Sequence, residues 1–189
     1  MELLLSLAVG IALSAACGFR VFVPLLVLSG AALSGHVHLA ESFSWVGTWP
    51  AFATFAAATL LEIGAYYVPW IDNALDSIAT PAAVVAGIIV TASVLTDVSP
   101  HLRWTLALIA GGGAAGLVQG VTVGTRHTSS LATGGMGNPF VSSFEAVGAL
   151  ATSVVALAWP ILALVVVAII AALLVRRSVR KRQLQKIGL

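Results

Sequence analysis

The chain has 189 residues, of which 59% are hydrophobic and only 8% are charged, and its mean hydropathy is +1.05. Soluble domains carry about 25% charged residues, so this composition excludes a water-soluble globule and predicts an integral membrane protein. The net charge of +2 says little, because six of the nine basic residues gather in the last fourteen positions. Beside an apolar helix, that tail indicates a cytoplasmic stop signal rather than a nucleic-acid patch, and we expect no nucleic-acid partner.

Six stretches are candidate membrane crossings, since a spanning helix needs about twenty mostly apolar residues. They are residues 3–33, 49–68, 80–95, 102–124, 140–157 and 161–175. The first is too long for one straight span and is interrupted around Gly18 to Arg20, which predicts a broken or strongly tilted helix. The predicted fold class is an all-α polytopic membrane protein with about six transmembrane helices.

The basic tail and the tryptophans predict the orientation. A cytoplasmic tail and six crossings place both termini in the cytoplasm of a multi-pass protein of the cell inner membrane. Aromatic residues anchor helices at membrane interfaces, and four tryptophans fall at the predicted outer ends: Trp45, Trp49, Trp104 and Trp159. The side chains of His36, His38, Asp97 and His101 also fall on that side. Their types suit zinc, but their spacing matches no compact motif, and we predict no metal site.

An ordered set of features occurs twice along the chain. Small residues recur every four positions before Arg20 and again before Arg126, ending in "GFR" and "GTR". "LEIGA" around Glu62 is then echoed by "FEAVGA" around Glu145. Three crossings per unit predict a 3+3 inverted repeat with broken helices, made of residues 1–98 and 99–176 and followed by the basic cytoplasmic tail at 177–189. The similar depth of the two glutamates does not fit an exact inversion.

The glycine faces allow two interpretations. Glycines at four-residue spacing let helix backbones approach closely, which favours packing between the first and fourth predicted helices. Alternatively, the face formed by Gly112, Gly116 and Gly120 is an interface between copies of the chain in a homo-oligomer.

The buried charges are the best guide to function. A charge within the membrane costs about 2.5 to 3.5 kcal/mol on insertion scales, so Arg20, Glu62, Arg126 and Glu145 need partners. We expect Arg20 to face the protein interior within reach of Glu62 or Glu145. One interpretation makes the set a substrate-binding or coupling site at the repeat interface, because arginine suits carboxylate or phosphate and a buried glutamate suits proton coupling. The other makes them structural salt bridges.

Three further polar residues are candidates for the same function. Asn138 lies in the polar, glycine-rich segment after Arg126, which either lines a vestibule or forms an ordinary turn. Asp72 and Asp76, four residues apart, are a possible gate or simply the solvated start of a helix. The sequence has no catalytic signature and predicts no cofactor. An enzyme is therefore not expected, and an intramembrane enzyme that uses the arginines and glutamates stays open as an alternative.

The chain resembles the bacterial membrane family catalogued as domain of unknown function 4126. The resemblance is carried by "GFRVFVP" (18–24), "LEIGAYYVPWID" (61–72), "LDSIATPAA" (75–83) and "GNPFVSSFEAVGA" (137–149). It implies a polytopic membrane protein and supplies no substrate or catalytic residue. The predicted function is a small transporter or channel-like protein for an anionic or proton-coupled solute. The alternative is a membrane scaffold or lipid-binding module without transport.

Overall fold

The fold is entirely helical in the residues that can be described. The computed structural model describes residues 1–67, 69–169 and 172, and for residues 69–76 it describes the backbone alone. No strand occurs among them, which confirms the predicted all-α class. The elements are α1 (Glu2–Cys17), α2 (Phe22–Leu33), the 3-10 helix η1 (Glu41–Gly47), α3 (Trp49–Ala65), α4 (Pro69–Val94), α5 (Pro100–Leu106), the π-helical segment η2 (Ala107–Gly112), α6 (Gly113–Thr133) and α7 (Asn138–Ala158).

Three helical stretches in the described residues are long and apolar enough to cross a membrane. They are Ser77–Val94, Pro100–Thr133 and Asn138–Ala158. A fourth candidate combines η1 and α3, which are bent by 64° at Thr48. The helices α1, α2 and Pro160–Ile169 are apolar but shorter. The structure therefore supports a membrane protein with three to four candidate spans, and it does not confirm six.

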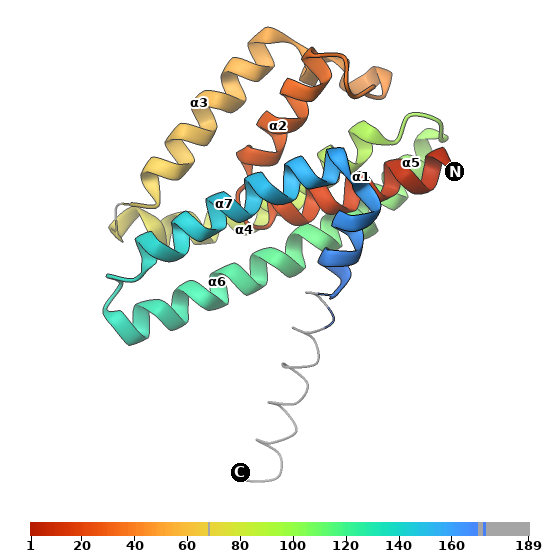
Figure 1. The fold of residues 1–189 in the computed structure, drawn as a ribbon. Helices are drawn as coiled ribbons and strands as arrows, with labels where there is room; N and C mark the ends of the chain where they lie inside the picture. Colours follow the sequence, from red (N-terminus) through yellow and green to blue (C-terminus); the bar gives the residue numbers. More distant parts are fainter. Residues whose placement is uncertain (68, 170–171, 173–189) are drawn as a thin grey trace, which may run out of the picture.

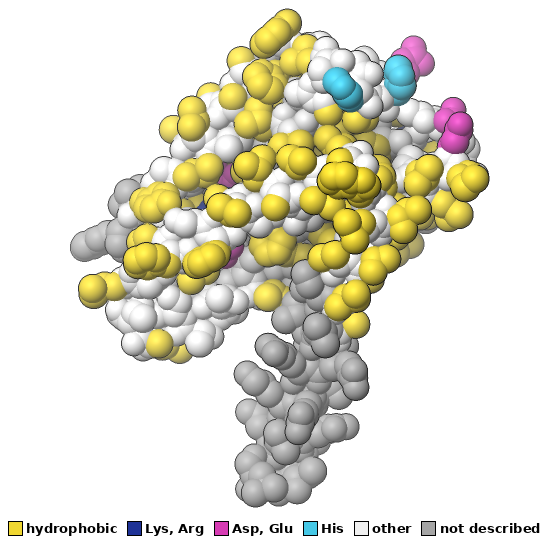
Figure 2. Space-filling view, in the orientation of Figure 1, with side chains coloured by type: hydrophobic (Ala, Val, Ile, Leu, Met, Phe, Trp, Pro, Cys, Tyr) yellow, Lys and Arg dark blue, Asp and Glu magenta, His cyan; other side chains and the backbone are white. Residues whose placement is uncertain are grey.

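The surface of the molecule suits contact with lipid. Large apolar side chains are exposed along α6 and α7, among them Leu117, Val121, Phe144 and Val147. Figure 2 shows hydrophobic side chains spread over the whole face in view, while the histidine side chains that are visible lie at one end, next to acidic side chains. A water-soluble protein would not leave so much contiguous apolar area uncovered, because its exposure to water is unfavourable.

The first predicted crossing is a helical hairpin rather than a span. α1 is 16 residues long, about 24 Å, and it ends at the break before Arg20. α2 then turns back from this break (Figure 1). Glu2 and His38 line one pocket together with Asp97. The backbone N–H of Ala40 also donates to the carbonyl of Ser93 at the end of α4, with a distance of 2.8 Å. The predicted break is correct, and the shared pocket does not support the prediction that the N-terminus and His38 lie on opposite sides of the membrane, which is not confirmed.

Small residues hold α1 in the centre of the bundle. A Cβ atom on Gly18 would lie 2.6 Å from the carbonyl oxygen of Ala115, so the end of α1 touches the backbone of α6. The Ser14 hydroxyl lies 2.6 Å from the Gly87 carbonyl oxygen and 2.7 Å from the Thr91 hydroxyl of α4. The Gly18 contact agrees with the prediction that small residues pack the first helix against the fourth predicted helix, whereas the Ser14 contacts join the first helix to the third.

The glycine face formed by Gly112, Gly116 and Gly120 packs against α4 over only part of its length. Cβ atoms on Gly112 and Gly116 would meet Ile88 and Val84 of α4, at 3.1 and 3.4 Å. Gly120 and Gly124 have nothing within 4 Å. The predicted homo-oligomer through this face stays a prediction.

The predicted inverted repeat is not confirmed. The start of α1 and residues 96–98, just before α5, line the same pocket, and in Figure 1 α1 and α5 both begin at the end marked N. α1 and the continuous stretch α5–η2–α6 therefore run in the same direction. Two inverted copies would run in opposite directions, because their axis lies in the membrane plane.

The polar segment after Arg126 folds as helix and tight turn. α6 continues to Thr133 and ends at Gly134, whose φ of 62° is the left-handed conformation typical of a glycine that ends a helix. α7 begins at Asn138 with Pro139 in its first turn, where a missing N–H costs nothing. The segment was predicted either to line a vestibule or to form an ordinary turn, and its backbone between Thr133 and Asn138 is an ordinary turn. Arg126 consequently lies inside α6 rather than at its end.

Candidate functional site

Four charged side chains from four parts of the chain converge in the interior. Arg20 lies in the break between α1 and α2, Glu62 in the last turn of α3, Arg126 on α6 and Glu145 on α7. Figure 1 shows that the end of α3 and the start of α7 lie close together at the end opposite N. Arg20 is 1% exposed, and Arg126 and Glu145 are also buried.

Glu145 binds both arginines. The Nε atom of Arg126 lies 3.1 Å from each carboxylate oxygen of Glu145, and its Nη2 atom contacts Oε2. The Nη2 atom of Arg20 lies 3.4 Å from the same Oε2. The prediction that Arg20 faces the interior and reaches a glutamate is thus correct, and the glutamate is Glu145. One carboxylate therefore compensates part of the charge of two guanidinium groups.

Tyr66 completes the cluster, and the sequence analysis missed it. The Cζ atoms of Arg20 and Arg126 each lie 4.0 Å from the centre of its ring, which is a cation–π distance. Tyr66 directly follows α3 and is buried. The signal that would have found it is its position four residues after Glu62, because residues four apart share one face of a helix.

Arg20 is only partly satisfied by hydrogen bonds. Its Nη2 atom donates to the carbonyl oxygen of Ser142, at 2.9 Å, and also contacts the Ser142 hydroxyl. Its Nε and Nη1 atoms are buried and have no hydrogen-bond partner among the described residues. Buried polar groups are nearly always hydrogen-bonded, and unpaired charged donors cost more than neutral ones. These N–H groups are therefore free to bind an acceptor.

Glu62 has a different role from the one predicted. Its Oε1 accepts from the backbone N–H of Val21 at 2.8 Å, and its Oε2 accepts from that of Phe22 at 3.1 Å. Among the described residues it forms no ion pair. These two N–H groups begin α2, so the carboxylate caps that helix and faces the positive end of its dipole.

The other predicted site residues lie around this cluster or outside the description. The Nδ2 atom of Asn138 donates to the Ser130 hydroxyl at 2.9 Å, which ties the start of α7 to α6. The side chains of Asp72 and Asp76 lie outside the described residues, so the gate stays a prediction. The basic tail at 177–189 also lies outside them.

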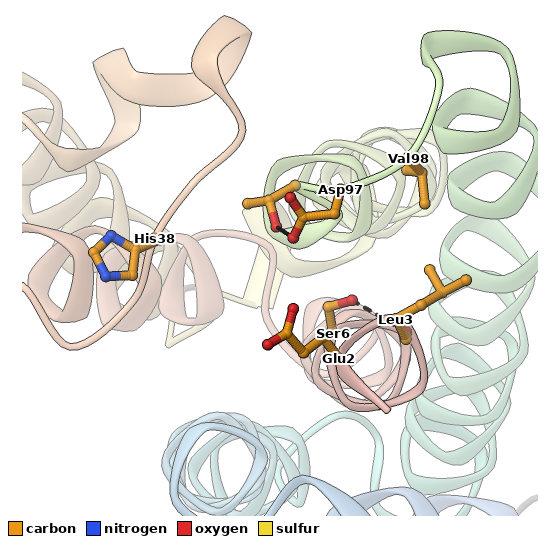
Figure 3. Close-up of a pocket in the computed structure, with 7 residues that line it drawn as sticks. Glu2, Leu3, Ser6, His38, Asp97 and Val98 are labelled. Carbon is orange, nitrogen blue, oxygen red and sulfur yellow. Dashed lines mark hydrogen bonds between the residues drawn. The ribbon is translucent and has the colours of Figure 1, made fainter.

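A separate pocket of about 430 Å³ lies at the end marked N. Figure 3 shows Glu2 and Ser6 from α1 around it, with His38 from the segment after α2 and Asp97 from the segment after α4. Asp97 accepts from the Thr96 hydroxyl at 2.8 Å. Among the described residues, no group of three histidine, cysteine or acidic side chains could hold a metal ion.

The chemistry that the cluster supports is binding of an anion. Two guanidinium groups and a serine hydroxyl are donors, and a forked guanidinium matches the two oxygens of a carboxylate or phosphate. The backbone N–H groups of Val21 and Phe22 already donate to Glu62. The surrounding low-dielectric interior strengthens such contacts.

Comparisons with known proteins give a family and no function. A family model described as "Domain of unknown function (DUF4126)" matches residues 7–180. No curated protein and no solved structure matches the chain.

Proposed function

The chain belongs to the family of domain of unknown function 4126, and from its structure we propose that it is a membrane transporter or channel-like protein for a small anion. Arg20 and Arg126 bind the carboxylate or phosphate group of the solute, with Tyr66 and Ser142 beside them. We place the protein in the cell inner membrane, with its basic tail in the cytoplasm.

The observation that carries the proposal is that Arg20 is buried with incomplete hydrogen bonding. Its side chain is completely buried, yet Nε and Nη1 have no hydrogen-bond partner among the described residues. A guanidinium that served only to fix helix positions would be expected to satisfy its donors within the protein, because each unmade bond costs about 1–3 kcal/mol. A bound anion would satisfy them.

Uptake into liposomes containing the purified chain tests this proposal. Radiolabelled pyruvate, phosphate and chloride distinguish a carboxylate, a phosphate group and a simple halide. We expect uptake of one of these anions to fall about tenfold or more in Arg20→Gln, because a hydrogen bond to a charged group contributes about 1.5–3 kcal/mol. Arg20→Lys should recover little, since lysine cannot present the planar fork.

Arg103→Gln is the matched control. Arg103 is part-buried, unlike the fully buried Arg20, and it donates to the carbonyl oxygens of Leu95 and Thr96 beyond the end of α4, at 2.8 and 3.1 Å. Its substitution should leave uptake unchanged once the amount of folded protein is equal.

The second candidate function is a scaffold or lipid-binding module in which the charges are structural. The two-oxygen contact between Arg126 and Glu145 favours it, because such a pair fixes α6 against α7 without any ligand. Uptake of none of the three anions by the wild-type chain, together with a stability loss in Arg20→Gln, would favour this candidate over transport.

A further inference from the structure

Glu62 is held by a helix N-terminus rather than by an arginine. Its two carboxylate oxygens accept from Val21 and Phe22, the first N–H groups of α2. Pro24 has no N–H, so Glu62 takes up most of the donors that a free helix N-terminus would offer. The twelve residues of α2 give this end a dipole that favours a negative charge.

The same place has the parts of an anion site. Helix N-termini bind carboxylate and phosphate groups through their backbone N–H groups. Here Arg20 directly precedes those N–H groups, and its side chain is fully buried with Nε and Nη1 unpartnered. Both guanidinium groups also lie 4.0 Å from the ring of Tyr66, whose backbone N–H donates to the Glu62 carbonyl, so the arginines lie beside the residue that carries this carboxylate. The site thus already contains a carboxylate, and that carboxylate is tethered to α3.

We propose that Glu62 is a built-in ligand of the anion site, which leaves the start of α2 when it takes up a proton and is replaced by the carboxylate of the solute. This inference rests on the proposed function and adds proton coupling to it. The proton comes from the aqueous phase and neutralises Glu62, while the entering monovalent anion restores the lost negative charge. One proton therefore accompanies each anion, and the total charge of the site stays constant.

The groups that face Glu62 fit this exchange. They are Cys17 at the end of α1, Arg20 in the break, Tyr66 one turn further on the chain, Arg126 on α6 and, bound to both arginines, Glu145 on α7. Neither arginine forms an ion pair with Glu62 within 4.0 Å, so its release breaks two backbone hydrogen bonds and no salt bridge.

Chemical rescue of Glu62→Ala tests the tethered ligand directly. The truncation leaves the two N–H groups empty, and acetate supplies a free carboxylate. For the purified full chain in detergent near neutral pH, we expect acetate to raise the Tm of Glu62→Ala. Above the dissociation constant, each tenfold increase in acetate should add the same increment. The wild-type chain and Glu41→Ala, which lacks an exposed carboxylate, should not respond. A Tm of Glu62→Ala that acetate does not change more than sodium chloride of equal ionic strength would overturn the proposal.

Glu62→Gln gives a second measurement if Glu62→Ala does not fold. Its side chain has the same shape but cannot exchange a proton. In liposomes, we expect wild-type pyruvate uptake to increase when the outer solution is acidified, and we expect Glu62→Gln to lose that dependence. Uptake that requires Arg20 but has the same pH dependence in Glu62→Gln would overturn proton coupling by Glu62 and leave the proposed transport intact. Acetate rescue without any Arg20-dependent uptake would support the ligand role of Glu62 and overturn the transport function and its coupling.

Discussion

Glu145 is the residue on which the buried arginines converge, and its loss should be costly. Glu145→Gln leaves the guanidinium groups of both Arg20 and Arg126 without this carboxylate. Breaking a buried ion pair by removing one partner costs about 3–5 kcal/mol. We therefore expect Glu145→Gln to lower the thermal stability in detergent more than Arg20→Gln, which removes only one of the two cations.

Comparing the Tm values of these two variants checks whether the Glu145 carboxylate is shared by Arg20 and Arg126. If Arg20→Gln and Glu145→Gln lower the Tm equally, Glu145 compensates one arginine alone. A larger loss in Arg20→Gln would contradict the arrangement described for the cluster.

Gly18 is where the end of α1 approaches α6 most closely. A Cβ atom there would lie 2.6 Å from both the Ala115 carbonyl oxygen and the Val118 Cβ, and 2.8 Å from the Gln119 nitrogen. Because backbone atoms cannot move aside cheaply, we expect Gly18→Ala to destabilise the protein by about 1–3 kcal/mol. The same shift would move Arg20, so anion binding should weaken as well.

Gly124→Ala is the control for that substitution. Gly124 belongs to the equivalent "GTR" tripeptide but has nothing within 4 Å, and it lies inside α6. Replacing an exposed helical glycine with alanine stabilises a helix by up to about 1 kcal/mol. A thermal melt in which both variants lose the same stability would show that close packing is not the reason.

At the scale of helices, the sequence predicted where elements begin and end better than how they turn. The break at Gly18 to Arg20 and the helices α3 and α7 follow from apolar runs and helix-ending residues, whereas α6 continues to Thr133, beyond the predicted end at 124. The direction of α2 depends instead on a contact from forty residues away, the Glu62 carboxylate at its N-terminus. No local pattern carries that information, which is why a hairpin was predicted as a single crossing.

The candidate site shows the same division. The high cost of charge in an apolar chain identified Arg20, Glu62, Arg126 and Glu145. It could not assign the partners, because Glu62 binds a helix end while Glu145 serves two arginines. Tyr66 was missed since an aromatic residue in a membrane protein needs no special explanation.

The hairpin formed by α1 and α2 predicts a labelling pattern. Glu2, His38 and Asp97 line one pocket, while Leu131 lies near the end of α6, which runs away from it. In cells expressing single variants with cysteine at these exposed positions, a membrane-impermeant maleimide should label Glu2→Cys, His38→Cys and Asp97→Cys from one side. Leu131→Cys should react from the other side. The native Cys17 is buried and should stay silent.

Labelling of Glu2→Cys and His38→Cys from opposite sides would restore the single broken crossing. It would also contradict the position of Arg20 at the tip of a hairpin, on which the proposed site depends.

In the molecule as a whole, close packing of α1, α4 and α6 separates the pocket at the end marked N from the charged cluster. Cβ atoms on Gly10 and Gly87 would lie 3.0 Å from Thr91 and 2.7 Å from Ala115, so α1, α4 and α6 meet without space for even a methyl group. The Ser14 hydroxyl bonds α1 to α4 between them. A solute that passes between α1 and α4 needs these helices to separate, and we expect the proposed transport to use that movement.

A disulfide between α1 and α4 should therefore stop transport without removing the site. A Cβ on Gly10 lies 3.3 Å from the Thr91 Cβ, close to the separation that a disulfide spans. In liposomes, we expect the oxidised Gly10→Cys/Thr91→Cys variant to lose anion uptake and to regain it on reduction. Stabilisation by the anion in detergent should persist in both states, because Arg20 and Arg126 are unchanged. Ala32→Cys/Gly47→Cys is the control, since these Cβ atoms lie 3.1 Å apart between α2 and η1 and do not join α1 to α4. Undiminished uptake by the fully oxidised Gly10→Cys/Thr91→Cys variant would show that the solute does not pass between α1 and α4.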